Sequence, residues 1–339
     1  MTRQLAALAL ALGMLGAWAQ DANALMLAMK GYYNIPFFYP DYPGYVNPDG
    51  VGVYNDGVNG PEFYVYYGAE RWIGQLSING PSGSTMSYDQ TISVSGPNKS
   101  NMDFDFVPLG QTLTVNGTTY GEGTMLLLNS GSVNYDRLYV RERGSGNYAG
   151  AAEEVYLPDL NSLVPRTGAA IGSYGGKTVI YDVDNENSVT DIRVTDISGV
   201  HDVNNRPNPT TTFDVHQGQP SIVGLRPSEI EFSHTLNRSF VLGVEAGKMA
   251  VYIGKNFTEM IDLRALAAEG GLVLDANTID FTGLAIDDVT GDFWMLTTNG
   301  LLVNFGKPVL TIPEPSTFAM AGMGILALLA YRRRQRKTA

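Results

Sequence analysis

The amino-acid sequence predicts an all-β fold for the central part of the chain, residues 25–311. This part is rich in Gly, Asn, Asp, Thr, Tyr and Val, and short runs that alternate apolar and polar residues recur about every dozen positions. Turn-forming residues separate the runs, which is typical of antiparallel strands joined by tight connections. Both ends of the chain differ from this pattern, because each carries a continuous apolar segment next to basic residues.

The expected strands share this alternation and their flanking turns. They are Glu62–Tyr67, Thr91–Ser95, Asp103–Val107, Thr112–Val115, Met125–Leu128, Arg137–Arg141, Thr178–Val183, Ser239–Val244, Met249–Ile253, Asp292–Thr297 and Leu301–Phe305. Hairpin turns are expected where Asn and Gly tolerate a positive φ angle, at Asn55-Asp56-Gly57, Asn79-Gly80, Asn116-Gly117 and Asn299-Gly300. The central part contains a single expected helix, over Phe257–Glu269.

The second half of the central part repeats itself at a spacing of about 53 residues, which lies near the blade lengths of β-propellers. Each repeat has a strand, an acidic or polar turn, a second strand, a glycine and a third strand. The stretch Thr282–Trp294 resembles a blade segment of NHL-like propellers. With 40–45 residues in a blade, the resemblance implies about six or seven blades. A β-sandwich or two β domains remain the alternative, because residues 25–170 show no such period.

Residues 1–24 have the order of regions found in a secretory signal peptide. A short positive stretch precedes the apolar run Leu5–Trp18, and Ala22-Asn23-Ala24 supplies a small-x-small cleavage pattern. We therefore expect the mature chain to begin at Leu25 or, after an alternative cut, at Gln20.

The C-terminal segment 312–339 combines an extended Pro-Glu-Pro triplet, an apolar run and a basic end. The run Phe318–Tyr331 would form about 21 Å of helix, less than the roughly 30 Å of a bilayer's hydrocarbon. The basic end cannot be buried in a globular core, and the positive-inside rule places such cations on the cytoplasmic side of a membrane. These cations include Arg332, Arg333 and Arg334.

This tail resembles the PEP-CTERM sorting signal through Pro313, Glu314 and Pro315, the apolar helix and the arginine cluster. The resemblance implies an exosortase as the partner that processes the tail, and a source among Gram-negative bacteria that make extracellular polysaccharide. We expect the body to face the periplasm, anchored briefly at the inner membrane, before it reaches the cell surface or extracellular matrix. A plain C-terminal membrane anchor is the alternative.

Charge and cysteine content exclude several kinds of function. Residues 25–313 carry 16 basic and 32 acidic residues, a net charge of −16, which repels nucleic acid and anionic membranes. The absence of cysteine excludes thiol catalysis and thiolate zinc sites. The segment Gly172–Thr178 has the glycines of a phosphate loop but the wrong spacing, so it is interpreted as a hairpin.

Metal candidates are weakly patterned. Asp182, Asp184 and Glu186 supply oxygen ligands suited to calcium, although the EF-hand spacing fails and a solvated acidic turn explains them equally. The three histidines, His201, His216 and His234, have no metal-binding spacing, and surface positions explain them. The sequence therefore predicts no cofactor, with calcium as a possible ligand.

Candidates for catalysis and glycan binding are few. Pairs of carboxylates suited to glycoside hydrolysis occur at Glu153-Glu154, Glu229-x-Glu231 and Asp287-Asp288. The tyrosine-rich stretch of residues 31–67 could stack on sugar rings, or it could pack in strands. Its three candidate stacking residues are Tyr39, Tyr42 and Tyr45.

The sequence assigns no catalytic residue, and it favours a non-enzymatic surface or matrix protein that binds extracellular polysaccharide. The alternative is a polysaccharide-acting propeller enzyme, a lyase or a hydrolase. A site that gathers histidine, arginine or paired carboxylates would favour the enzyme, whereas a smooth face of Tyr and Asn would favour binding.

Overall fold

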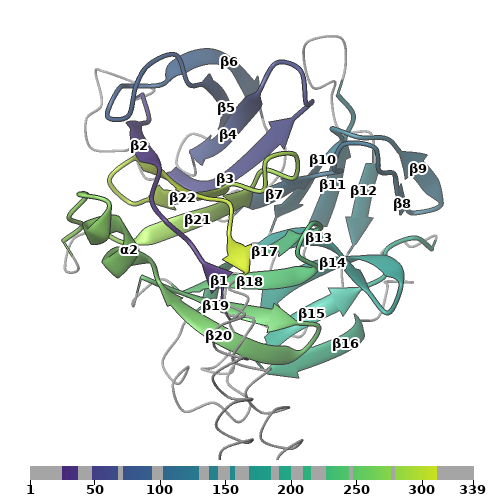
Figure 1. The fold of residues 1–339 in the computed structure, drawn as a ribbon. Helices are drawn as coiled ribbons and strands as arrows, with labels where there is room; N and C mark the ends of the chain where they lie inside the picture. The colour runs from purple at the N-terminus through teal and green to yellow at the C-terminus, as the bar shows by residue number, and fades with distance from the viewer. Residues whose placement is uncertain are drawn as a thin grey trace, which may run out of the picture. The chain divides into compact units, whose positions relative to one another are not determined.

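The fold is a five-bladed β-propeller, in a computed structural model that describes residues 25–36, 48–67, 72–93, 102–129, 137–143, 153–156, 168–184, 191–199, 209–214, 227–243, 247–275 and 279–310. Five antiparallel four-stranded sheets surround a common centre (Figure 1). The innermost strand of each sheet lies against those of its two neighbours, which closes the ring. These inner strands are β3 (Pro48–Asn55), β7 (Met102–Phe106), β13 (Ala169–Tyr174), β17 (Pro227–Ser233) and β21 (Phe281–Ile286).

The blades are numbered here by their inner strands. Blade 1 is completed by β4 (Pro61–Tyr67), β5 (Trp72–Ser77) and β6 (Ser87–Ser93), and blade 2 by β10 (Met125–Asn129), β11 (Arg137–Arg141) and β12 (Glu153–Tyr156). Blade 3 contains β14 (Lys177–Asp184), β15 (Asp191–Thr195) and β16 (Pro209–Asp214), and blade 4 contains β18 (Arg238–Gly243), β19 (Lys248–Ile253) and β20 (Asn256–Asp262). Blade 5 contains β22 (Phe293–Thr297), β23 (Leu301–Gly306) and β2 (Gly31–Asn34).

Blade 5 joins the two ends of the propeller chain. Its three inner strands come from the C-terminal part, whereas its outermost strand β2 comes from the N-terminal part and pairs Gly31 with Asn304. The Nζ atom of Lys30 lies 2.7 Å from Oδ1 of Asp292, which adds an ion pair across the same junction. Closure by strands from both ends of the chain completes blade 5, which then packs between blades 4 and 1.

Two short elements lie outside the five blades. Between β7 and β10 the chain forms a hairpin of β8 (Leu113–Val115) and β9 (Thr118–Tyr120). Separately from the propeller, β1 (Leu25–Met26) pairs with β24 (Val309–Leu310) in an antiparallel ribbon. Within the residues that the structure describes, no helix is long and apolar enough to span a membrane, and the signal and sorting segments lie outside those residues.

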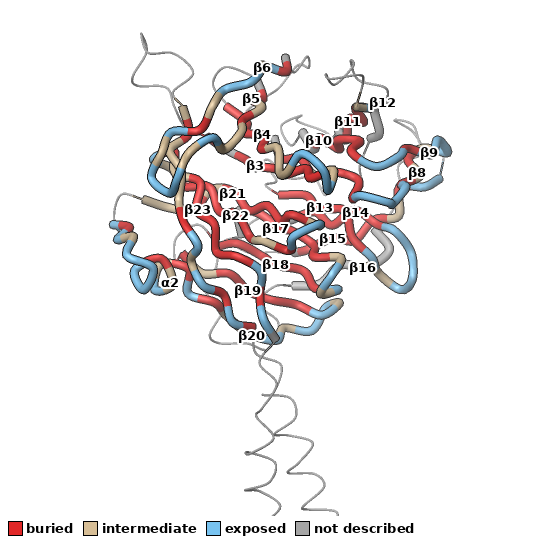
Figure 2. Tube along the Cα trace, turned by 45° about the horizontal axis from the view of Figure 1, so that its top comes forward, coloured by how far each residue is buried: buried red, intermediate tan, exposed pale blue. Residues whose placement is uncertain are grey.

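The hydrophobic core lies between neighbouring blades, where the central strands are almost wholly buried (Figure 2). Aromatic pairs join adjacent sheets: Tyr64 and Phe106 lie 4.9 Å apart between blades 1 and 2, and Phe240 and Phe293 lie 4.5 Å apart between blades 4 and 5. Alternation along each strand sends apolar side chains into these layers on both sides. Because the sheets stack face to face in a ring, each blade buries both of its faces.

The all-β and propeller predictions are confirmed, but the predicted blade count of six or seven is wrong. Successive inner strands begin at residues 48, 102, 169, 227 and 281, so a blade occupies between about 54 and 67 residues. The spacing of about 53 residues was visible in the sequence, but a generic blade length of 40–45 residues gave too many blades. The β8–β9 hairpin accounts for part of the extra length in blade 2.

Every expected strand overlaps an observed strand, and the four expected hairpin turns join strands as predicted. Asn116 and Gly117 both have positive φ angles, 52° and 84°, as a tight hairpin requires. The segment Gly172–Thr178, whose glycines resemble a phosphate loop, also forms a hairpin, with its turn at Gly175 and Gly176 between β13 and β14.

The expected helix over Phe257–Glu269 is correct only in its second half. Its first half is the outer strand β20, and the helix α2 spans Leu263–Glu269. The Asp262 side chain accepts a hydrogen bond from the backbone N–H of Ala265, so it caps the helix at this later start. Pairing of β20 with β19 prevails over local helix preference in this segment.

Candidate functional site

Acidic side chains gather where the inner strands meet around the propeller axis. On β7 the apolar residues Phe104 and Phe106 enter the layer toward blade 1, so the intervening Asp103 and Asp105 project from the opposite face. Asp103 Oδ2 accepts a hydrogen bond from the backbone N–H of Ala169, and Asp105 Oδ2 accepts one of 2.6 Å from Ile171. Both carboxyl groups therefore reach the backbone of the neighbouring inner strand, β13.

Strand β17 repeats this arrangement on the other side of the ring. Ile230 and Phe232 pack into the layer toward blade 3, and the alternating Glu229 and Glu231 are 2% and 4% exposed. The carboxyl group of Glu229 accepts a hydrogen bond from the backbone N–H of Leu284 on β21. Carboxyl groups of two inner strands thus bond to the free backbone groups of the next inner strand.

These carboxyl groups lie in two tiers along the axis. In the deeper tier, Asp103 and Glu229 hydrogen-bond directly to each other. Because a hydrogen bond between two carboxyl groups needs a proton, one member of the pair is protonated. Burial, and the charge of Asp103 next to it, raise the pKa of Glu229 well above its ordinary value, so Glu229 holds that proton.

The outer tier, termed here the outer triad, consists of Asp105, Glu231 and Asp288 from blades 2, 4 and 5. Burial raises the pKa of Asp105 to about 7. Burial and the charges of Asp105 and Asp287 raise the pKa of Asp288 to about 8. The pKa of Glu231 is raised well above its ordinary value, first by burial and then by Asp105, Asp103 and Asp288.

The turn after β21 orders the rim of the outer triad. Asp287 accepts a hydrogen bond of 2.9 Å from the side-chain amide of Asn55 at the end of β3, and its other oxygen accepts two from the backbone of its own turn. The carboxyl group of Asp288 accepts a hydrogen bond from the backbone N–H of His234. Blades 1, 4 and 5 are therefore tied together at this end of the axis.

Little positive charge balances these acids. Among the described ion pairs none involves Asp103, Asp105, Glu229, Glu231 or Asp288. The ring of His234 packs edge-on against Phe232, and burial lowers the pKa of this histidine, which favours its neutral form. In the described part of the chain no three His, Asp or Glu residues have a geometry that could hold a metal ion.

The outer triad can therefore exchange protons near neutral pH. Two carboxyl groups with pKa values of about 7 and about 8 provide one group that is largely ionised and one that is largely protonated at pH 7.5. Such a pair supplies a base and an acid at the same place. Asp105 and Asp288 are only partly buried, so they are the members closest to solvent.

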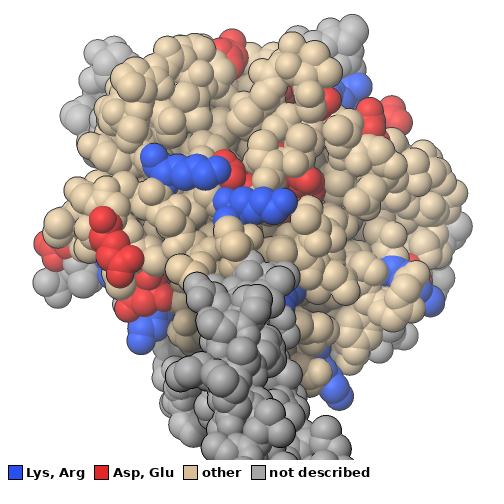
Figure 3. Space-filling view, in the orientation of Figure 1, with Lys and Arg blue, Asp and Glu red and all other residues tan. Residues whose placement is uncertain are grey.

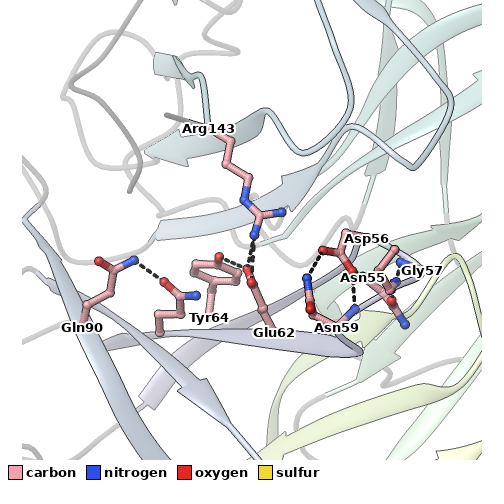
Figure 4. A network of polar contacts seen from close by, with 10 residues as sticks. Asn55, Asp56, Gly57, Asn59, Glu62, Tyr64, Gln90 and Arg143 are labelled. Atoms are coloured by element: carbon pink, nitrogen blue, oxygen red, sulfur yellow. Dashed lines mark hydrogen bonds and ion pairs between the residues drawn. The ribbon is translucent and has the colours of Figure 1, made fainter. Parts of the chain in front are cut away.

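A second polar group lies between blades 1 and 2 (Figure 4). Arg143 donates to both carboxylate oxygens of Glu62, at 2.8 and 2.9 Å, and its guanidinium lies 4.7 Å from the ring centre of Tyr54. The hydroxyl of Tyr64 donates to the same Glu62 carboxylate at 2.8 Å. This network links the sheets through polar contacts next to their aromatic layer. On the face shown in Figure 3 charged side chains are sparse, and acidic and basic ones lie close to each other.

Of the three predicted calcium ligands, the structure describes the side chain of Asp182 alone. The carboxylate of Asp182 is engaged by Arg193, which donates to its two oxygens at 2.7 and 2.6 Å inside blade 3. This ion pair makes Asp182 a poor calcium ligand, because its charge is already balanced. The Asp184 side chain and Glu186 lie outside the described residues, as do His201 and His216.

Four of the described tyrosines in this stretch follow the packing alternative, whereas Tyr32 and Tyr33 are half-buried. Tyr54, Tyr64, Tyr66 and Tyr67 are each at most 5% exposed. The proposed stacking residues Tyr39, Tyr42 and Tyr45 lie outside the described residues, so stacking by them stays a prediction.

Two of the three carboxylate pairs predicted from the sequence lie at the candidate site. Glu229 and Glu231 reach the axis, and Asp287 and Asp288 stand at its rim, whereas the side chains of Glu153 and Glu154 are outside those described. Sequence reasoning missed Asp103 and Asp105 as members of this site. The alternation Met102-Asp103-Phe104-Asp105-Phe106 was a signal, because two acids there occupy one face of a strand whose other face is aromatic.

Comparisons with known proteins identify the tail and the fold. Residues 311–334 match the PEP-CTERM protein-sorting motif, which confirms the resemblance predicted from Pro313, Glu314 and Pro315. This motif is the recognition tail of exosortase, so the chain is an exported protein that is processed at the cell envelope. The match covers the tail alone and leaves the propeller unassigned.

The body resembles solved propellers. One is the crystal structure of Myxococcus xanthus glutaminyl cyclase, with a TM-score of 0.50 and 12% sequence identity over 86% of this chain and 99% of that chain. At this identity the likeness concerns the fold. No curated protein matches the chain.

Proposed function

We propose that this exported, exosortase-processed propeller is an acid–base enzyme whose outer triad transfers protons to and from an extracellular polysaccharide. The observation that carries the proposal is the convergence of Asp105, Glu231 and Asp288 from three blades. The pKa values of Asp105 and Asp288 are raised to about 7 and about 8, that of Glu231 is raised well above its ordinary value, and no described basic side chain pairs with them. The sequence placed the enzyme second to a binding role, and the gathering of paired carboxylates reverses that order.

Glycoside hydrolysis is the reaction that such a set supports best. It needs one protonated carboxyl group to donate to the leaving oxygen and one carboxylate to activate water or attack the sugar. Asp288, with the higher pKa, suits the acid, and Asp105 suits the base. The charges of Asp105 and Asp288 both raise the pKa of Glu231, so Glu231 would stay protonated beside them.

Glutaminyl cyclisation is a second candidate, favoured by the name of the similar propeller. In that reaction the α-amine of an N-terminal glutamine attacks its own side-chain carbonyl, a C–N bond forms and ammonia leaves. The steps need only proton transfers, which carboxyl groups with pKa values near neutrality can perform.

The test measures turnover by the processed protein. The host's extracellular polysaccharide is assayed for new reducing ends, and a glutaminyl peptide for released ammonia, between pH 5 and pH 9. We expect Asp105→Asn and Asp288→Asn each to reduce kcat on the order of 10²-fold or more. Asp89→Asn, an exposed isosteric change on β6, should leave kcat unchanged.

The outcomes separate the candidates. Turnover of the polysaccharide, lost in both variants, supports glycoside hydrolysis, and turnover of the peptide alone supports cyclisation. If the protein is retarded in gels that contain the polysaccharide but turns over neither substrate, the enzyme proposal is wrong and the protein binds the polysaccharide without catalysis. We propose the same route in each case: brief anchoring at the inner membrane facing the periplasm, followed by release to the cell surface or matrix.

A further inference from the structure

One buried arginine of blade 2 has no counter-charge among the residues that the structure describes. Arg141, the last residue of β11, is 4% exposed, and none of the described ion pairs involves it. Its Nε atom is sealed from solvent and has no hydrogen-bond partner. The other deeply buried arginines differ, because Arg193 pairs with Asp182 and Arg238 lies 3.6 Å from Glu259.

Strand pairing fixes the direction of this side chain. Arg141 stands opposite Met125 on β10, which in turn stands opposite Phe106 on β7. Met125 and Phe106 belong to the cluster that packs blade 2 against blade 1, as does Tyr139 two residues before Arg141. Side chains that share a face of a sheet point the same way, so Arg141 projects toward blade 1.

The boundary between these blades already binds one carboxylate with an arginine. Two residues beyond Arg141 along the chain, Arg143 holds Glu62 of blade 1 and lies over the ring of Tyr54 (Figure 4). The boundary can therefore accommodate a carboxylate between a guanidinium and aromatic rings. Arg141 supplies a cation beside the same aromatic layer, and no carboxylate of the described residues pairs with it.

An unpaired guanidinium in this position is costly. Burial lowers the pKa of Arg141, but a guanidinium stays protonated at any pH that proteins experience, so the charge cannot be removed by titration. A buried charge that keeps its ionised form needs a partner. We propose that Arg141 anchors a binding site for a carboxylate ligand between blades 1 and 2.

Charge selects the kind of anion. The body has a net charge of −16, whose field repels an anion in proportion to the anion's own charge. A singly charged carboxylate is therefore favoured over sulfate, and its planar pair of oxygens matches the guanidinium fork. A sugar acid and a simple carboxylic acid share this chemistry.

To test the site, the processed protein is titrated with glucuronate, acetate or sulfate at constant ionic strength, and its melting temperature is measured at each concentration. We expect the wild type to be stabilised by glucuronate or acetate in a saturable manner. Arg141→Met should lose this response and melt no lower than the wild type without ligand, since it removes an uncompensated charge. Arg141→Lys keeps a cation without the fork and should bind about tenfold more weakly or worse.

The matched control is Arg264→Met, because Arg264 already pairs with Asp280 at 2.8 Å. This variant should respond to the anions as the wild type does. Stronger stabilisation by glucuronate than by acetate assigns the ligand to a sugar acid, and equal stabilisation assigns it to the carboxylate alone. No response of the wild type to either carboxylate, or an undiminished response of Arg141→Met and Arg141→Lys, would overturn the site, and stronger binding of sulfate would overturn its carboxylate class.

Discussion

The ion pair between Asp182 and Arg193 makes a sharp prediction about the stability of blade 3. The two side chains are 1% and 0% exposed, face each other across the β14–β15 pairing and are joined by two hydrogen bonds of 2.7 and 2.6 Å. Removing one partner leaves a buried charge alone. We therefore expect Arg193→Met to lower the free energy of unfolding by about 3–5 kcal/mol at pH 7. This is a large part of the roughly 5–15 kcal/mol that stabilises an ordinary domain.

The two single variants should differ in their pH dependence. In Arg193→Met the remaining buried Asp182 can take up a proton, so its destabilisation should shrink as the pH falls from 7 toward about 4, the ordinary pKa of an aspartate in an unfolded chain. In Asp182→Leu the remaining Arg193 cannot lose its proton, so the destabilisation should be at least as large and should persist at low pH. The double variant contains no charge and should lie within about 1–2 kcal/mol of the wild type.

Urea unfolding of the processed protein, followed by circular dichroism, measures these free energies. Lys177→Met is the control within the same blade, because the Lys177–Asp196 pair is exposed, and it should change stability by less than about 1 kcal/mol. The reasoning is refuted if Arg193→Met costs no more than Lys177→Met, or if the double variant is as unstable as the single ones.

Three further predictions concern the axis, the blade packing and the tail. Asp103, Asp105 and Asp288 have pKa values raised from 3.8 to about 6, about 7 and about 8, so the folded protein binds more protons than the unfolded chain between about pH 4 and pH 8. Stability should therefore fall as the pH rises through this range, and Asp105→Asn should flatten the fall; a melting temperature that rises from pH 5 to pH 8 contradicts this. A Cβ atom at Gly172 would clash with the rings of Tyr181 and Phe232, so Gly172→Ala should lower the free energy of unfolding in urea by about 1–3 kcal/mol. Gly121→Ala is the control, because its Cβ meets nothing within 4 Å and its φ is not left-handed, and it should change stability by less than about 0.5 kcal/mol. Mass spectrometry of the surface form should find no Arg332–Lys337 end, and an intact end would mean that the tail is not processed.

The sequence by itself determined that the protein is exported and that its secondary structure is mainly β-strand. Pro313, Glu314 and Pro315 belong to a contiguous motif, so the sorting signal can be recognised from neighbouring residues without knowledge of the fold. Strand identity was equally local, because alternation in segments such as Arg137–Arg141 and turns such as Asn116-Gly117 depend on residues a few positions apart.

Only the tertiary structure decided the blade count and the candidate site. The count depends on where inner strands recur, and inserted segments such as the β8–β9 hairpin change that spacing without altering local pattern. The pKa values of Asp105, Glu231 and Asp288 arise from burial and mutual repulsion between residues more than 50 positions apart, which no local pattern contains. Asp182 looked like a calcium ligand in the sequence and is paired with Arg193 in the fold, because a side chain's partner is chosen by strand pairing rather than by composition.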